Sequence, residues 1–281
     1  EDLIKYEPEF ETSKPGVTID DLAIDESGEF FVTLTDPEFD CSELGDDCPI
    51  DGTGVLSGSF KLNSKPWTIA ICDVKSLDGL QANPEKTSEK GTGNDFIPAG
   101  EYFKATFKPI IHGDYYTRNS LTTPELCNYK TTRNYYTVKQ SGQEHSAPFT
   151  VTFDLEYPSA STGSSLANLE GFSENYEFSK PSAPGQAVMR EESFVWDEVG
   201  SILLKADAHY LNQNLEQSNL TIGRFYPDYF KITGTTWAEP DNQSGFTYMS
   251  QNFKNVNFQI TAYNAATPNK PTSNYQHFAS N

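Results

Sequence analysis

The residues best suited to chemistry are five aspartates in one short acidic segment. They are Asp36, Asp40, Asp46, Asp47 and Asp51, and the segment around them is rich in Gly and Pro. Calcium takes six to eight oxygen ligands, and turns rich in Asp and Gly can supply both carboxylate and carbonyl oxygens. The spacing lacks the regular Asp-x-Asp-x-Asp-Gly pattern of an EF-hand loop. We therefore interpret the segment first as a solvated loop and keep calcium binding as the alternative.

The sequence carries no pattern typical of an enzyme. It lacks a Gly-x-Ser-x-Gly nucleophile elbow, a His-Glu-x-x-His motif and a glycine-rich phosphate-binding loop. Carboxylate pairs arise by chance in a chain with 40 acidic residues, so no pair is singled out. The histidines show no mutual ligand spacing; they are His112, His145, His209 and His277. We expect a non-enzymatic protein without a cofactor, apart from calcium in the alternative above.

The four cysteines favour disulfide bonds over a metal site. They are Cys41, Cys48, Cys72 and Cys127, and four cysteines allow three pairings. One pairing closes a small ring between Cys41 and Cys48 and a loop of about 50 residues between Cys72 and Cys127. Zinc is disfavoured because the sequence has no Cys-x-x-Cys spacing. We expect both disulfides, with free thiols as the alternative.

The elements that must position these residues repeat along the chain. Residues 99–107 contain Phe-Lys and a second Phe, and Thr132-Arg-Asn-Tyr135 follows downstream. Residues 249–258 again contain Phe-Lys and a second Phe, and Thr272-Ser-Asn-Tyr275 follows. Each copy is preceded by a basic residue, Pro and aromatics that run into an apolar strand. Such repeats indicate an array of similar modules, and we expect a piece of a longer rod that ends inside a module.

Short runs with period-two alternation predict an all-β fold of tandem immunoglobulin-like β-sandwiches. Aromatic residues make up 13% of the chain, which suits the half-buried strands of a thin sandwich. We assign residues 1–73 to a first, N-terminally incomplete sandwich and residues 74–232 to a second, enlarged one. Residues 233–281 begin a third, truncated module. Whether residues 74–232 form one sandwich or two stays open.

The aromatic residues of these strands fit structural roles. A Tyr after Asn, as in Asn134-Tyr135 and Asn274-Tyr275, can pin a loop through a hydroxyl-to-backbone hydrogen bond, as in a tyrosine corner. Trp67, Trp196 and Phe225 are better explained as core or junction anchors than as a sugar-binding platform.

The negative charge of the chain argues against nucleic acids and anionic lipids as partners. A formal net charge of −20 repels phosphate backbones and anionic lipid headgroups, so we expect no nucleic-acid partner. No apolar run approaches the 18 or so residues of a membrane span, so we expect no membrane insertion in this segment. The composition is typical of a secreted or surface protein.

Several motifs, in order along the chain, resemble the MshQ family. The most specific are Ile222-Gly-Arg-Phe-Tyr-Pro-Asp-Tyr-Phe230 and Gly245-Phe-Thr-Tyr-Met249. Ser64-Lys-Pro-Trp-Thr-Ile-Ala-Ile-Cys72 is a further match. That family is encoded with the mannose-sensitive haemagglutinin (MSHA) type IV pilus of marine gammaproteobacteria. The resemblance implies a long, exported, β-rich protein with immunoglobulin-like repeats, in the periplasm or on the outer surface of a Gram-negative bacterium. It carries over no catalytic residue.

Two functions follow as expectations. The first is a stalk or adhesion segment in MSHA pilus biogenesis and attachment, with pilus or cell-surface components as partners. The second is a lectin-like adhesin module that binds surface glycans, with calcium as its metal.

Overall fold

The computed structural model describes residues 18, 23–40, 46, 53–84, 94–112, 124–140, 142–159, 163–164, 169–170, 175–240 and 245–278. Strands dominate the described residues. The helical turns among them include two short 3-10 segments, η2 (Pro124–Asn128) and η4 (Asn274–His277). The predicted all-β sandwich fold is thus confirmed. No helix in the described part of the chain is long and apolar enough to cross a membrane.

The centre of the molecule is one sandwich of two four-stranded antiparallel sheets. The first sheet contains, in spatial order, β3 (Thr68–Ser76), β4 (Tyr102–Ile110), β10 (Arg190–Trp196) and β8 (Leu169–Glu170). The second contains β14 (Ser218–Phe225), β11 (Gly200–Asp207), β7 (Pro148–Tyr157) and β9 (Asn175–Glu177). Two small hairpins flank them, namely β5 (Val138–Gln140) with β6 (Gln143–His145) and β12 (His209–Tyr210) with β13 (Gln213–Asn214).

Alternating apolar residues close the sandwich around an aromatic core. The ring of Phe194 lies 5.6 Å from that of Phe103 and 5.3 Å from that of Phe153. Phe107 and Phe149 meet across the core with ring centres 5.1 Å apart. Each buried aromatic ring contributes on the order of 1.5–3 kcal/mol through its burial. This continuous core shows that the strands between residues 68 and 225 form one sandwich.

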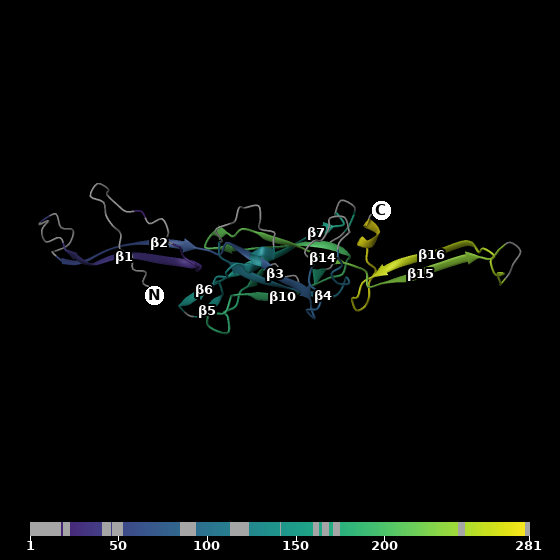
Figure 1. Cartoon of the computed structure of the whole chain (residues 1–281), viewed down its shortest axis with the longest axis horizontal. Coiled ribbons are helices and arrows are strands. Elements are labelled where there is room, and N and C mark those ends of the chain that lie inside the picture. Colours follow the sequence, from purple (N-terminus) through teal and green to yellow (C-terminus); the bar gives the residue numbers. More distant parts are fainter. Residues whose placement is uncertain are drawn as a thin grey trace.

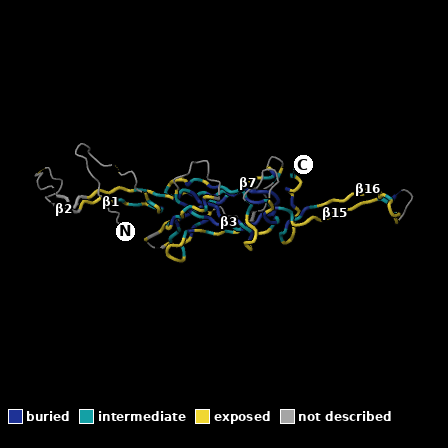
Figure 2. Tube along the Cα trace, in the orientation of Figure 1, coloured by how far each residue is buried: buried dark blue, intermediate teal, exposed yellow. Residues whose placement is uncertain are grey.

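Two long hairpins project from opposite ends of this sandwich (Figure 1). The first arm pairs β1 (Gly28–Asp40) with β2 (Thr53–Ser64), and the second arm pairs β15 (Tyr229–Ala238) with β16 (Lys254–Tyr263). Figure 2 shows that the arms are largely exposed or half-buried, whereas most of the buried residues lie in the sandwich between them. Within the region predicted as a first sandwich, residues 1–73, the described strands are therefore a two-stranded arm and the start of β3, which pairs with β4 in the central sandwich.

A second, smaller core lies where η2 covers β3 and β4. Ala70, Ile110 and Leu126 pack there around the disulfide between Cys72 and Cys127. This bond is one of the two predicted from the cysteine spacing. Cys41 and Cys48, the other predicted pair, lie outside the described residues.

Candidate functional site: two repeated clamps at the ends of the sandwich

The turn between β10 and β11 places two carboxylates against the second Thr-x-Asn-Tyr segment. The Glu198 carboxylate accepts hydrogen bonds from the backbone N–H of Ser273 at 2.9 Å and of Asn274 at 2.9 Å. The Ser273 hydroxyl donates a third bond at 2.6 Å. Glu198 is 6% exposed, and a carboxylate at that depth is stable when donors surround it.

The neighbouring Asp197 completes this clamp. Its carboxylate pairs with Lys270 Nζ at 2.7 Å, and its backbone carbonyl accepts a bond from Asn264 Nδ2 at 3.0 Å. Asn264 Oδ1 in turn accepts the backbone N–H of Lys270 at 2.8 Å. We call residues 197–200 together with residues 270–275 the second clamp. It fastens the base of the second arm to the sandwich.

The same arrangement occurs at the other end of the sandwich. Asp25 forms an ion pair with Lys130, and Glu26 Oε2 accepts the backbone N–H of Arg133 at 3.0 Å. Asn134 Nδ2 donates to Ser27 O at 2.6 Å, while Ser27 N–H donates to Asn134 Oδ1 at 2.9 Å. We call residues 25–28 together with residues 130–135 the first clamp.

Each clamp thus pairs Asp-Glu-x-Gly with Lys-x-Thr-x-Asn-Tyr. Sequence inspection found the Thr-x-Asn-Tyr half in both copies but not its acidic partner. The missed signal is present in the chain, because Asp25-Glu26-Ser27-Gly28 and Asp197-Glu198-Val199-Gly200 share three of four residues. The bonded positions lie 107 residues apart in the first clamp and 75 in the second, so no local pattern connects them.

The two clamps differ at their tyrosines. Tyr135 is 1% exposed, and its hydroxyl donates to the backbone carbonyl of Pro148, 13 residues downstream, at 2.8 Å, so that it makes a hydroxyl-to-backbone bond as expected. Burial, with a smaller contribution from Tyr210, raises the pKa of this hydroxyl well above its usual value. Tyr275 is 43% exposed and packs edge-on against Phe230 of the second arm.

The other aromatics that the sequence singled out also have structural positions. Trp196 and Phe225 are buried in the main core with ring centres 5.3 Å apart. Trp67 packs beside the smaller core, 4.8 Å from the ring of His112. None of these three side chains forms an exposed platform.

The predicted calcium ligands are not brought together among the described residues. Asp36 and Asp46 are exposed, and no group of three or more His, Cys, Asp or Glu side chains gathers in the part of the chain that the structure describes. Asp40 ends β1 with its side chain undescribed, and Asp47 and Asp51 lie outside the described residues. The calcium site stays a prediction.

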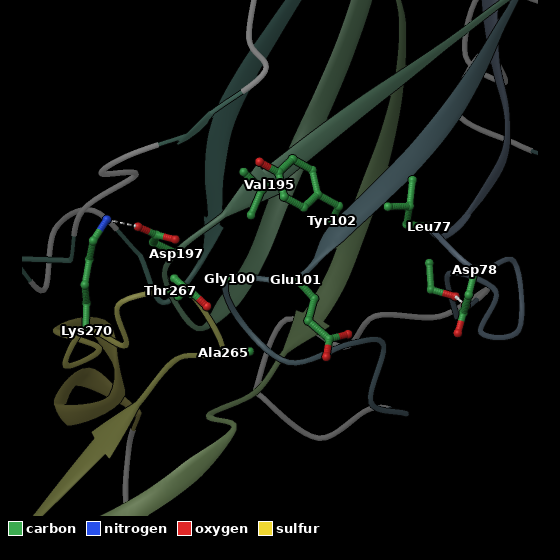
Figure 3. Close-up of a pocket in the computed structure, with 12 residues that line it drawn as sticks. Leu77, Asp78, Gly100, Glu101, Tyr102, Val195, Asp197, Ala265, Thr267 and Lys270 are labelled. Atoms are coloured by element: carbon green, nitrogen blue, oxygen red, sulfur yellow. Dashed lines mark hydrogen bonds and ion pairs between the residues drawn. The ribbon is translucent and has the colours of Figure 1, made fainter.

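A hollow of about 690 Å³ lies beside the second clamp, between the sandwich and the base of the second arm (Figure 3). Its carboxylates are Asp78, Glu101 and Asp197, which come from different segments and point in different directions. Burial, followed by the charges of Asp228 and Asp78, raises the pKa of Glu101. Lys270 is already paired with Asp197. Ser76 also lines the hollow, and its hydroxyl donates a hydrogen bond to Asp78 Oδ1 at 2.5 Å.

A glycine allows the joint between the sandwich and the second arm to close. Gly100 has a φ of +85°, and a Cβ there would lie 2.6 Å from the backbone nitrogen of Ala266. Beside it, the Ala265 N–H donates to Ala99 O at 2.7 Å. The loop after the second arm thus rests directly on the backbone of the sandwich.

Comparison with known families divides the chain at the second clamp. Residues 65–187 match the model of DUF6701, second domain, and residues 198–281 match the model of DUF6701, third domain. Together these two matches cover about three quarters of the chain. The chain matches no curated protein and no solved structure. Strands β11 and β14 fall in the third-domain match, yet they complete the sandwich that begins in the second-domain match.

Proposed function

We propose that this chain, which belongs to the DUF6701 family, is a non-enzymatic stalk segment of a secreted or surface protein. In such a stalk, consecutive modules share strands and are fastened by clamps, so that the segment transmits force between a distal contact and the cell. The observation that carries the proposal is the duplication of the clamp at the two ends of one sandwich.

The contacts of the clamps support a stiff joint. In the second clamp three donors converge on Glu198, and Asn264 and Asn274 are each 1% exposed. Buried polar groups lose several bonds at once when they separate, so a joint of this kind has one strongly preferred geometry. Strand pairing also stiffens the joint. β11, which lies in the third-domain match, pairs along most of its length with β7 of the second-domain match.

The placement in an MSHA pilus system rests on the family resemblance. Residues 222–230, one of the two most specific motifs, run from β14 into β15 through the joint, where Tyr226 O accepts the Ala99 N–H at 2.8 Å. The motif therefore coincides with the part that a stalk must keep rigid. A disulfide between Cys72 and Cys127 suits the oxidising compartment that such a role requires.

Glycan binding is a second candidate function, favoured by exposed aromatics on the second arm. Trp237 is 61% exposed, and Phe246 and Tyr248 lie exposed beyond the end of β15 with ring centres 5.3 Å apart. Stacking of sugars on such rings would give saturable binding. A calcium-dependent lectin would in addition lose this binding in EDTA.

Shear separates the two functions. In bacteria that display the whole surface protein, Glu26→Ala with Glu198→Ala should leave attachment normal in still medium and reduce it under flow. Glu191→Ala is the control, because Glu191 forms an exposed pair with Lys104. Equal attachment of the clamp variant and the control at every shear rate would overturn the stalk. Loss caused by Trp237→Ala in still medium would favour the glycan-binding module.

A further inference from the structure

The second arm occupies the same structural position as the strand pair β3–β4. Thr132 N–H donates to Pro109 O at 3.0 Å after β4, and Thr272 N–H donates to Ala262 O at 2.9 Å after β16. Pro109 and Ala262 are therefore equivalent. In both pairs, moreover, the register shifts about midway along the first strand, between Cys72 and Lys75 in one and between Ile232 and Gly234 in the other.

This equivalence aligns core positions of the sandwich with exposed positions of the arm. Ile69, Ile71, Phe103, Ala105 and Phe107 of β3–β4 are at most 7% exposed. Their counterparts are 53–60% exposed, namely Phe230, Ile232, Val256, Phe258 and Ile260. The second arm thus presents the inner face of a sandwich without the sheet that covers it in the centre of the molecule (Figure 2).

The first arm is the counterpart of the covering sheet. Its strand β1 starts at Gly28 of the first clamp, as β11 starts at Gly200 of the second. The cross-strand pairs also correspond. Phe30 of β1 pairs with Leu62 of β2, and at the equivalent position Ile202 of β11 pairs with Ile222 of β14. In the sandwich β14 lies against β3, where the Ser218 hydroxyl donates to Ile69 O.

The first arm also has an uncovered apolar face. Phe30, Val32, Leu34, Phe60 and Leu62 lie on one side of it, and Leu34 and Phe60 are about half exposed. We propose that the second arm of one copy of this chain docks face to face on the first arm of a second copy, as β3–β4 docks on β14–β11. The contact joins two different surfaces, so it continues head to tail along a rod.

The size of the two faces sets the strength of this contact. A ten-residue strand is about 33 Å long, so a two-stranded face about 10 Å wide buries less than the roughly 1,200–2,000 Å² of a stable complex. The net charge of −20 on each copy opposes association further at low salt. We expect reversible assembly at high protein concentration and moderate salt.

The test is sedimentation velocity on the full chain over about a hundredfold range of concentration. Phe258→Glu disables the second arm and Phe60→Glu the first, and each should weaken self-association by about tenfold or more. Asn257→Glu and Ser59→Glu are matched controls on the opposite faces of the same strands. All four positions are exposed, and unchanged thermal unfolding confirms intact folding.

Mixing the variants decides the geometry. Phe258→Glu retains an intact first arm and Phe60→Glu an intact second arm, so an equimolar mixture should form dimers that neither variant forms alone. A wild-type chain that stays monomeric throughout would overturn the proposal and leave a hairpin from another source as the occupant. A mixture that stays monomeric, or equal effects of the control substitutions, would also overturn it.

Discussion

At the residue scale, the carboxylate of Glu198 organises a joint that no single stretch of sequence reveals. The repeated Asn-Tyr sites could be singled out in advance because both copies carry them. Their acidic partners could not be assigned, because contacts across 75 or 107 residues depend on how the strands fold back. The calcium prediction for the acidic segment at residues 36–51 stays untested, because only Asp36 and Asp46 of its five aspartates have described side chains.

Removing the Glu198 carboxylate should destabilise the protein markedly. Glu198→Ala leaves the N–H groups of Ser273 and Asn274 and the Ser273 hydroxyl without their acceptor, which should cost about 2–4 kcal/mol of unfolding free energy. Urea unfolding measures this cost. Glu191→Ala, at an exposed ion pair, should change it by less than about 0.5 kcal/mol. Similar values for the two variants would mean that the clamp adds little.

The Glu101 carboxyl should stabilise the folded protein slightly at low pH, where it is protonated, and should lose this contribution as the pH rises. Its pKa is raised above 4.5 in the folded state by burial and by the charges of Asp228 and Asp78. The folded state therefore holds this proton more tightly, and the contribution to stability falls as pH rises through the folded pKa. Glu101→Gln should raise the unfolding free energy at pH 7 by at most about 0.5 kcal/mol and leave it unchanged at pH 3. Thermal unfolding at both pH values would contradict this if the variant were less stable at pH 7.

At the scale of elements, period-two alternation located most of the strands correctly but not their register between repeats. The shared Phe-Lys pairs suggested that Phe103 corresponds to Phe253. When the two strand pairs are aligned on the hydrogen bonds to Pro109 and Ala262, Phe103 instead corresponds to Val256. Register is fixed by pairing and by the buried face, so two matching letters could not determine it. The two projecting arms could not be predicted either, because the strands of a hairpin and the strands of a sandwich have the same alternation of apolar and polar residues.

The start of β11 depends on a glycine that no other residue can replace. Gly200 has a φ of +123°, and a Cβ there would lie 2.0 Å from Tyr157 O of β7. Gly200→Ala should therefore lower the unfolding free energy by about 3 kcal/mol or more, by strain and by separating β11 from β7. Gly142→Ala is the control, because Gly142 also has a positive φ but open space around it. Equal losses in the two variants would show that backbone strain alone is responsible.

At the scale of the whole molecule, two exposed arms make the structure extended, and a net charge of −20 adds repulsion between its parts. The chain buries its apolar residues mainly in the central sandwich, and the arms extend far from it (Figure 1). Like charges along such an extended shape repel each other over the Debye length, which is about 30 Å at 0.01 M salt and about 10 Å at 0.1 M. The repulsion could be predicted from the amino-acid composition, whereas the position of the arms could be seen only in the structure.

Salt should therefore stabilise the protein, and the kind of salt tests the calcium alternative. Raising NaCl from about 0.01 M to about 0.1 M screens the excess of acidic residues and should raise the midpoint of thermal unfolding by a few degrees. CaCl₂ at the same ionic strength should act like NaCl if the acidic segment at residues 36–51 binds no calcium. A calcium site would add stabilisation that saturates and disappears when Asp46→Asn and Asp47→Asn are combined, because a bound ion favours the folded state by mass action. A midpoint that falls on adding NaCl would show that charge repulsion does not limit the stability of this molecule.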